Sequence, residues 1–391
     1  MIKRWMQSRT WKKFVRNRMA IAALFVVLIY IATGLLVLAG GLTVEDTLRR
    51  YGADSQPGLY QASNPEDRLR DVRIRVVQFE RALKRENVNA ALEQQRIGYY
   101  EAADLKPEEF QAIVTECFKQ IDELNAIRDF EQDESVIPRL EALEAESMKL
   151  YAPLDSSDRW KQSFAMLLGT DRQGRSILIR GIYSIKVAIQ IGVVTALVSV
   201  FIGSLLGAAA GYFGGIVDHM VIWLYSTVSS IPNLVLLVLL AYLFTGSSFD
   251  GTLVPVYVAF CATFWVGPCR VIRGETMKLK ELEYVQAATT VGFSGMYILV
   301  RHVLPNTAHL MLINFSLLLI GAIKSEVILS FLGLGVKSGA SWGIMISDSK
   351  PEVINGFFWQ IGTATAFMFV LVLAFNILSD ALQDVFDPKH N

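Results

Sequence analysis

The sequence predicts an all-α membrane protein with six transmembrane helices. Of its 391 residues, 52% are hydrophobic, and they are gathered into blocks separated by charged stretches. A bilayer core about 30 Å thick needs roughly 20 apolar residues in a helix, and a helix satisfies its own backbone hydrogen bonds in lipid. Six blocks come near that length: about 20–40, 186–211, 219–244, 252–268, 307–330 and 359–379.

The first block, 20–40, follows a basic N-terminal segment, residues 1–19. Residues 1–18 hold seven Lys and Arg and no acidic residue, and such segments are retained in the cytoplasm. The block could be the apolar core of a signal peptide, but its length and the lack of a small-x-small cleavage site favour a retained helix. Six crossings then leave both termini in the cytoplasm.

Glycines recur toward the end of the second block. Gly203, Gly207, Gly211 and Gly214 lie four, four and three residues apart, a spacing that lets two helices pack closely in lipid. The general enrichment of glycine in membrane helices explains the same residues equally well. The sequence leaves both interpretations open.

The fourth block, 252–268, is the weakest because it is short and has Pro255 near its start and Pro268 at its end. It leads into a polar segment, 268–306, which the count of crossings places on the cytoplasmic side. The basic residues of this segment indicate the same side. They are Arg270, Arg273, Lys278, Lys280 and Arg301.

The region 41–165 is a charged insertion between the first two spans, outside the membrane and opposite the cytoplasm. Residues 45–160 hold 16 Lys and Arg against 25 Asp and Glu. Apolar residues at helical spacing follow Pro65, recur from Phe110 to Leu124, and recur again after Pro138. This pattern predicts two or three amphipathic helices packed on one another. Their role is either structural or the docking of an extracytoplasmic partner.

The polar segment contains the most informative stretch, Glu283 to Gly292 followed by Arg301 to Asn306. It opens with helix-forming residues, reaches the small pair Ala287-Ala288 and breaks at Gly292, where glycine permits a sharp turn. This order predicts a short helix, a turn and a second helix in the cytoplasm. Small residues let a partner approach the backbone closely, although an ordinary amphipathic loop could carry the same pattern.

This stretch resembles the coupling loop of ABC-transporter permeases, which seats a helix in a groove of an ATPase. The small pair, the glycine four residues on and the later Leu-Pro fall at the family's spacing, whereas Gln286 replaces a common acid. The resemblance implies an ATPase-coupling loop built from Glu283, Tyr284, Gln286, Ala287, Ala288, Gly292, Leu304 and Pro305.

Three further stretches resemble the C-type permeases of dipeptide and oligopeptide systems. They are Leu168-Gly-Thr-Asp-Arg-Gln-Gly-Arg-Ser176, Arg270-Val-Ile-Arg-Gly-Glu275, and Leu329-Ser-Phe-Leu-Gly-Leu-Gly335 with Ser341-Trp-Gly343. Ser176 stands where the family usually has an acid. The matches cover residues 1–40 loosely and about 165–385 well, so the resemblance implies the type I ABC importer permease fold, with a five-helix transport core at 166–391.

The resemblance also implies a role and partners. The chain would form half of the translocation pathway of a bacterial inner-membrane peptide importer, pairing with a B-type permease, two ABC ATPase subunits and a substrate-binding protein. ATP would drive alternating access through the helix at 284–294. The alternative is a membrane-anchored scaffold or sensor that works through its acidic helical segment.

The residues that would support chemistry in this chain itself are lacking. No Gly-x-x-x-x-Gly-Lys-Ser/Thr sequence that cradles a phosphate is present, and no nucleophile elbow. The four His and three Cys have no metal-ligand spacing. A net charge of zero gives no general attraction to nucleic acid. We therefore expect no catalytic residue, metal or cofactor here, with ATP and Mg²⁺ bound by the partner ATPases.

Four residues are candidates for the outer gate or an outer interface. Asp171 and Arg175 are expected to fix a turn before the second span. Glu326 lies about 21 residues beyond Pro305, which places it near the outer membrane interface as an interfacial charge or a gate, and Trp342 belongs to the Ser-Trp-Gly stretch. Lys324 and Glu326 are two residues apart and point apart on a helix.

Overall fold

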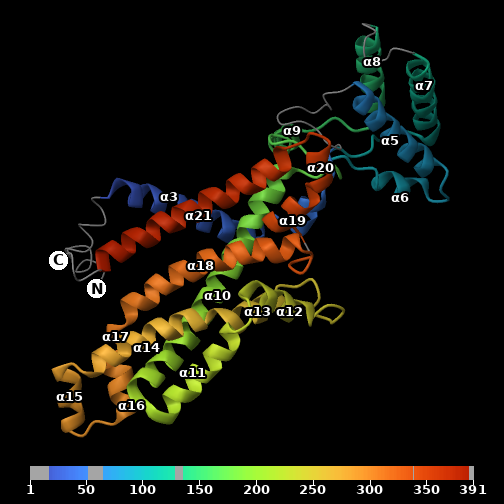
Figure 1. Cartoon of the computed structure of the whole chain (residues 1–391). Coiled ribbons are helices and arrows are strands. Elements are labelled where there is room, and N and C mark those ends of the chain that lie inside the picture. Colours follow the sequence, from blue (N-terminus) through green and yellow to red (C-terminus); the bar gives the residue numbers. More distant parts are fainter. Residues whose placement is uncertain (1–16, 52–64, 128–134, 338, 387–391) are drawn as a thin grey trace. The chain divides into compact units, whose positions relative to one another are not determined.

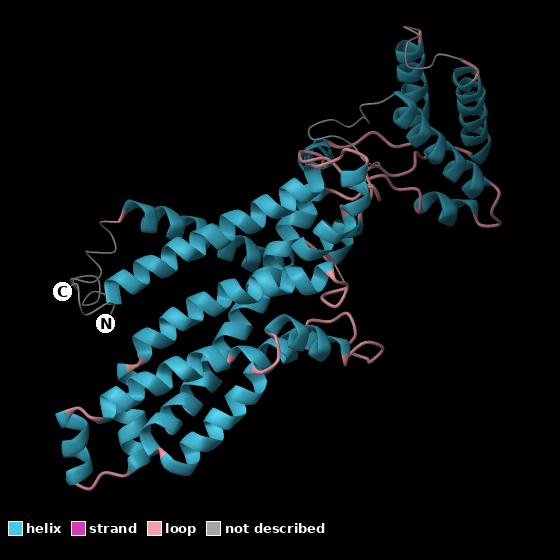
Figure 2. Cartoon of the chain, in the orientation of Figure 1, coloured by secondary structure: helices cyan, strands magenta, loops and turns pink. Residues whose placement is uncertain are grey.

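The computed structural model describes residues 17–51, 65–127, 135–337 and 339–386. The described residues are helices joined by loops, with only isolated β-bridges and no strand (Figure 2). Two compact units divide the chain. Unit 1 holds residues 1–42, 182–347 and 364–391, and unit 2 holds residues 43–181 and 348–363.

Unit 1 contains the membrane helices (Figure 1). Five continuous helices are long and apolar enough to span a membrane within the described residues: Arg18–Gly41, Ile177–Phe213, Val254–Lys280, Ala308–Phe331 and Trp359–Asp384. They comprise α3 (Arg18–Leu36) with a π-helical turn, α10 (Ile177–Phe213), α13 (Val254–Phe264) with α14 (Val266–Lys280), α18 (Ala308–Phe331) and α21 (Trp359–Phe386). This confirms the predicted all-α membrane class.

The predicted third span, 219–244, is not one straight helix. It consists of α11 (Gly215–Ser229) and α12 (Asn233–Tyr242), which are bent by 83° at the break between them. Pro232 explains the break, because its ring disfavours helical geometry at the preceding residue and it has no N–H to donate. With this pair counted as one span, the total is six.

The helix of the fourth block does not end at Pro268. It continues through α14 to Lys280, so the first part of the predicted polar segment is helical. Pro268 lies in the first turn of α14, where a missing N–H costs little. Its neighbour Cys269 still donates its N–H to the carbonyl of Trp265 at 3.0 Å, so the helix is not interrupted.

The α10 and α14 helices meet backbone to backbone along three glycines. A Cβ on Gly203 would lie against the carbonyl of Trp265, one on Gly207 against that of Cys269, and one on Gly211 within 2.7 Å of that of Arg273. Both sides of this contact repeat every four residues, and we call it the glycine seam. The close-packing interpretation is thus confirmed for three of the four predicted glycines.

Gly214 has another role. A Cβ there would meet nothing within 4 Å, but its φ is +65°, a conformation that glycine adopts readily and other residues rarely do. It stands at the N-cap of α11, so it turns the chain between α10 and α11.

Unit 2 holds helices that are not candidate membrane spans. They are α4 (Val44–Leu48), α5 (Pro65–Leu83), α6 (Val88–Glu93), α7 (Pro107–Asn125), α8 (Val136–Met148), α9 (Ser156–Ala165) and α20 (Lys350–Ile354). The predicted apolar stripes of α5, α7 and α8 are buried in one core, which confirms that these helices pack on one another.

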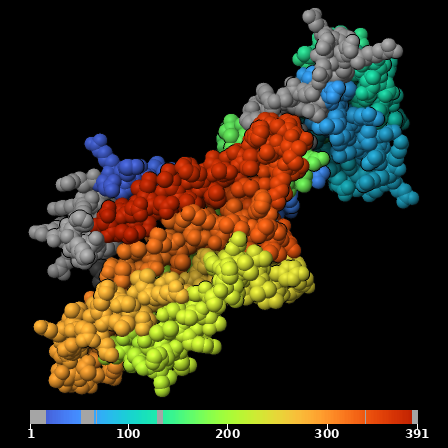
Figure 3. All heavy atoms as spheres, viewed as in Figure 1, coloured from blue at the N-terminus to red at the C-terminus, as the bar shows by residue number. Residues whose placement is uncertain are grey.

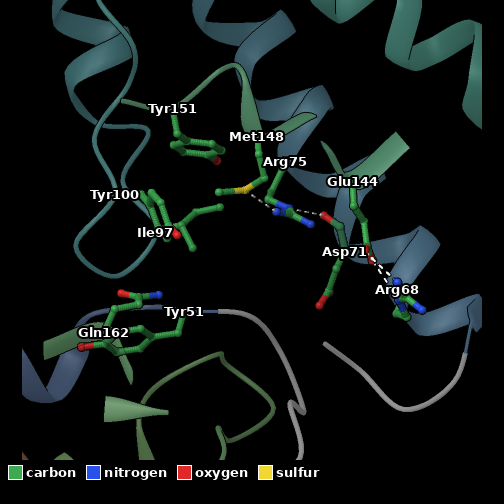
Figure 4. Close-up of a pocket in the computed structure, with 10 residues that line it drawn as sticks. All are labelled: Tyr51, Arg68, Asp71, Arg75, Ile97, Tyr100, Glu144, Met148, Tyr151 and Gln162. Atoms are coloured by element: carbon green, nitrogen blue, oxygen red, sulfur yellow. Dashed lines mark hydrogen bonds and ion pairs between the residues drawn. The ribbon is translucent and has the colours of Figure 1, made fainter. Parts of the chain in front are cut away.

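The core of this three-helix cluster is largely aliphatic and contains one group of packed aromatic rings. The Phe79 ring stacks on that of Phe110 at 5.7 Å and meets Tyr151 edge-on at 5.2 Å. At its rim Arg68 donates two hydrogen bonds to Glu144, at 2.8 and 2.7 Å. Arg68 and Glu144 also line a cavity of about 210 Å³, which Tyr51, Tyr100 and other residues complete (Figure 4).

The glycine seam makes a specific prediction. Gly207→Ala should destabilise the solubilised protein by about 1–3 kcal/mol, because the added methyl group would collide with a backbone carbonyl. Gly274→Ala on α14 is the matched control, since a Cβ there meets nothing within 4 Å and should stabilise the helix slightly. Thermal unfolding in detergent measures both, and equal melting temperatures for the two variants would contradict the seam.

Candidate functional site

The polar loop of unit 1 begins with α15 (Glu283–Thr290), a short two-sided helix. Val285 and Ala288 are buried in a cluster with Ile272, Ile298 and Val303. The other members of the predicted pattern on this helix, Glu283, Gln286 and Ala287, are exposed. One alanine of the pair therefore packs inward and the other faces outward.

The turn after α15 is a Schellman cap, in which two N–H groups beyond the helix close back on its last carbonyls. Gly292 donates to the carbonyl of Thr289 at 3.0 Å, and Phe293 donates to that of Ala288 at 3.2 Å. Gly292 has a φ of +93°, where a residue with a Cβ would be strained. The predicted turn at Gly292 is thus made by hydrogen bonds in defined positions.

The chain returns through α16 (Gly295–Ile298), a π-helical turn (Leu299–Val303) and α17 (Leu304–Asn306). Asn306 donates its side-chain amide to Tyr284 Oη at 2.9 Å and to the His302 carbonyl at 2.6 Å. Leu304 packs against the buried cluster, whereas Pro305 is exposed. The predicted Leu-Pro-Asn stretch therefore contacts the predicted helix directly.

The loop protrudes at one end of unit 1 (orange in Figure 3) and exposes seven large apolar side chains. Their exposed fractions run from 44% at Tyr284 to 74% at Val291. Contiguous apolar patches on soluble faces usually mark interaction sites. We call these seven together the apolar loop surface, and its members are Leu282, Tyr284, Val291, Phe293, Met296, Tyr297 and Val300.

Sequence reasoning identified only Tyr284 of these seven. A signal was available, because Phe293, Met296 and Val300 recur at spacings of three and four within a polar segment, which is typical of one helical face. Tyr297 joins them by stacking on Phe293 with ring centroids 5.0 Å apart.

Side-chain contacts attach the polar loop to α10 and α11. Arg273 of α14 donates to both carboxylate oxygens of Asp218 in α11, a paired geometry that is strong and directional. The Cβ position of Gly295 lies 3.2 Å from the Tyr212 ring and 3.1 Å from that of Phe213. These contacts attach the start of the loop to α11 and its return to the end of α10.

The predicted Asp171 and Arg175 lie together in unit 2, in a network of charges. Asp171 is 1% exposed and accepts from the N–H groups of Gln173 and Arg175 and from the Arg175 side chain at 2.7 Å. This arrangement is the turn that the sequence predicted. Arg180, also 1% exposed, donates to Asp171 and donates to Asp348 at 2.9 Å.

The roles of Arg180 and Asp348 were not predicted. They are 168 residues apart in the sequence, so no local pattern joins them. A faint signal was the presence of an Arg four residues into a 37-residue apolar helix, since a buried charge requires a partner. Ser176, which replaces the family's usual acid, caps this helix by accepting from the N–H of Ile179 at 3.2 Å, so the substitution keeps the capping role.

Glu326 and Trp342 lie in unit 1, and both are 1% exposed. Glu326 accepts a hydrogen bond from Ser330 at 2.6 Å. A Cβ on Gly343 would lie within 2.6 Å of Ser330 and one on Gly335 within 2.7 Å. Gly335 and Gly343 thus crowd Ser330, and Glu326 is buried within its own chain. Its place at the outer membrane interface stays a prediction.

The described residues contain no group of three His, Cys, Asp or Glu arranged to hold a metal ion. The geometry instead offers a rigid helix–turn–helix with an apolar outer side, fastened to membrane helices. Such a site can dock a partner and pass on its motion.

Comparison with known proteins gives matches over this same region. The family model described as "Binding-protein-dependent transport system inner membrane component" matches residues 203–391. The dipeptide transport system permease protein DppC of Bacillus subtilis is 36% identical over 235 residues, covering 60% of this chain and 70% of DppC. The oligopeptide permease protein OppC of Haemophilus influenzae is 34% identical over 222 residues, covering 56% and 70% of the two chains.

A third relative is named for another substrate. The glutathione transport system permease protein GsiD of Pectobacterium atrosepticum is 32% identical over 228 residues, covering 58% of this chain and 74% of GsiD.

The Asp171 network can be tested by stability. Asp171→Asn should cost about 3 kcal/mol, because it removes a buried charge that partners the Arg180 guanidinium. Asp158→Asn breaks an exposed pair with Lys161 and should cost less than about 1 kcal/mol. Thermal unfolding of both variants in detergent checks this, and a loss as small for Asp171 as for Asp158 would count against the network.

Proposed function

The chain belongs to the family of inner-membrane components of binding-protein-dependent transport systems, and we propose that it is the C-type permease subunit of an ATP-driven importer of dipeptides or oligopeptides. The first two relatives named above are permeases of dipeptide and oligopeptide systems. The third is a permease for glutathione, which is itself a small peptide. Peptides are therefore the substrate class that the relatives favour.

The apolar loop surface carries the mechanism that we propose. An ATPase subunit docks on it and, on binding ATP, moves α15. Because the Schellman cap, the Tyr284–Asn306 hydrogen bond and the buried cluster hold the loop together, it moves as one piece. The motion passes along α14 and, through the glycine seam, to α10. A second route leads through α17 to α18, which follow each other directly.

In this proposal ATP is hydrolysed by other subunits and not by this chain. Because the sequence has no phosphate-cradling loop, ATP and Mg²⁺ bind to two separate ATPase subunits. This chain would supply half of the translocation pathway and a B-type permease the other half. A substrate-binding protein would deliver the peptide from outside. The proposed mechanism gives this chain no bound cofactor and no nucleic acid.

The chain would cross the bacterial inner membrane with both termini in the cytoplasm. The basic residues 270–301 then lie on the ATPase side, as the positive-inside rule requires, and the α5–α8 cluster lies outside. There it is either a structural insertion or a contact for the binding protein. The scaffold or sensor alternative has no support among the relatives, which are all named as permeases.

If an ATPase subunit docks on the apolar loop surface, a charged residue introduced there should prevent the two proteins from assembling. Val291→Asp should reduce copurification of the ATPase at least about tenfold, since a carboxylate would lose its hydration on entering an apolar contact. Peptide uptake should fall in parallel. Ile74→Asp, on an exposed side chain of α5, is the control and should assemble normally. Full copurification and uptake with Val291→Asp would refute the docking surface.

The proposed membrane topology predicts which introduced cysteines react with a reagent added from outside the cell. In a background with Cys117, Cys261 and Cys269 replaced by alanine, Glu123→Cys in α7 should label with an impermeant maleimide in intact spheroplasts. Glu281→Cys, at the end of α14, should label only after permeabilisation. Both side chains are exposed, so access depends only on the side of the membrane. The reverse pattern would invert the proposed orientation.

A further inference from the structure

A stripe of exposed residues runs along α18. Leu317, Gly321, Lys324, Ile328 and Phe331 follow at spacings of four, three, four and three, which places them on one face of the helix. Leu317, Ile328 and Phe331 are 48%, 42% and 36% exposed, and Lys324 is also exposed. The stripe is therefore an uncovered apolar face with a single charge in its midst.

Lys324 and Glu326 differ sharply in their surroundings. Glu326 is buried and hydrogen-bonded to Ser330, so it cannot meet a ligand without rearrangement. Lys324 has no hydrogen bond or ion pair with any part of the chain that the structure describes. Of the two charges that the sequence placed near the outer mouth, only Lys324 is available.

Its position within a candidate span makes this exposure unusual. Lys324 is the seventeenth of the 24 residues of α18, roughly 10 Å from the end of the helix at 1.5 Å per residue. Residues 19–41 and 359–379, in the spans with the least buried windows, contain no Asp, Glu, Lys or Arg. An ionisable residue within a membrane span usually faces a water-filled cavity or a partner rather than lipid.

We propose that Lys324 faces the translocation pathway and binds the C-terminal carboxylate of the passing peptide. This inference rests on the proposed function, in which the substrates are peptides that share that group. Gly321, one turn away on the same stripe, leaves room beside the ammonium, because a Cβ there would meet only Phe264, at 4.0 Å.

The chemistry of lysine suits transient binding. Its ammonium is a compact, strongly hydrated charge with three donors on a flexible stem. It can take a carboxylate from any direction and release it again without the fixed geometry of a bidentate arginine contact. A pathway needs binding that is favourable enough for entry but weak enough for exit.

The test measures uptake of trialanine and of trialanine amide by proteoliposomes that hold the whole importer, with the binding protein supplied. The wild type should prefer the free acid. Lys324→Met should lower trialanine uptake about tenfold or more and abolish the preference, whereas Lys324→Arg should keep it. Lys337→Met removes a lysine paired with Asp250 outside the span and should change neither uptake nor preference.

ATPase copurification and thermal unfolding show whether each variant assembles, and Lys324→Gln replaces Lys324→Met if the latter does not. Wild-type uptake with an unchanged preference in Lys324→Met, as expected for a lysine that reaches lipid headgroups, would overturn the inference and leave the importer intact. Failure of the assembled wild type to transport either peptide would overturn the proposed function and this inference with it.

Discussion

The direct backbone contact between α10 and α14 is the constraint on which the rest of unit 1 depends. Three glycines on α10 face three carbonyls of α14, each set spaced by one helical turn. With no side chain between them, neither helix can slide or rotate without a collision, because packed backbones do not deform continuously. A membrane gives little hydrophobic drive for helix association, so such close van der Waals contact is what holds the pair together. A partner that displaces α14 must therefore displace α10 as well.

The contact between α10 and α14 also determines what the polar loop can do, because α15 follows directly after α14. The ion pair of Arg273 with Asp218 extends the attachment to α11, and the contact of Gly295 with the aromatic end of α10 closes it on the return. The apolar loop surface is thus carried by a rigid body rather than a flexible tether. A flexible loop would absorb a partner's motion locally, whereas a rigid one must transmit it. The Schellman cap at Gly292 serves this rigidity, since it satisfies carbonyls that would otherwise fray.

Much of this could be predicted from sequence, and the reasons are physical. Span length and hydropathy follow from bilayer thickness, and the turn at Gly292 and the glycine seam follow from local spacing. Pro232 bends the third span although it lies within a continuous apolar run, and Pro268 does not end the fourth helix because it lies in the first turn of α14. The Arg180 network could not be predicted, because its partners Asp171 and Asp348 are joined only by the fold. The apolar loop surface was not predicted because its residues are spread over α15, α16, the π-helical turn and the residues between them, so no single local pattern joins them.

Two charged residues of α18, Lys324 and Glu326, show that the position of a charge on a helix, and not only its identity, decides its role. Glu326 and Lys324 are neighbours in sequence, yet a separation of two residues on a helix directs them to different faces. The acid is buried and accepts a hydrogen bond from Ser330, which two glycines crowd in turn, and so it acts as a structural group. The base faces the open stripe, where the helix supplies no partner and the surrounding residues are apolar. A desolvated carboxylate is tolerable when hydrogen bonds replace its water, but an unpartnered ammonium is tolerable only where water or an anion reaches it. The exposed charge, not the buried one, therefore carries information about what lies outside this chain.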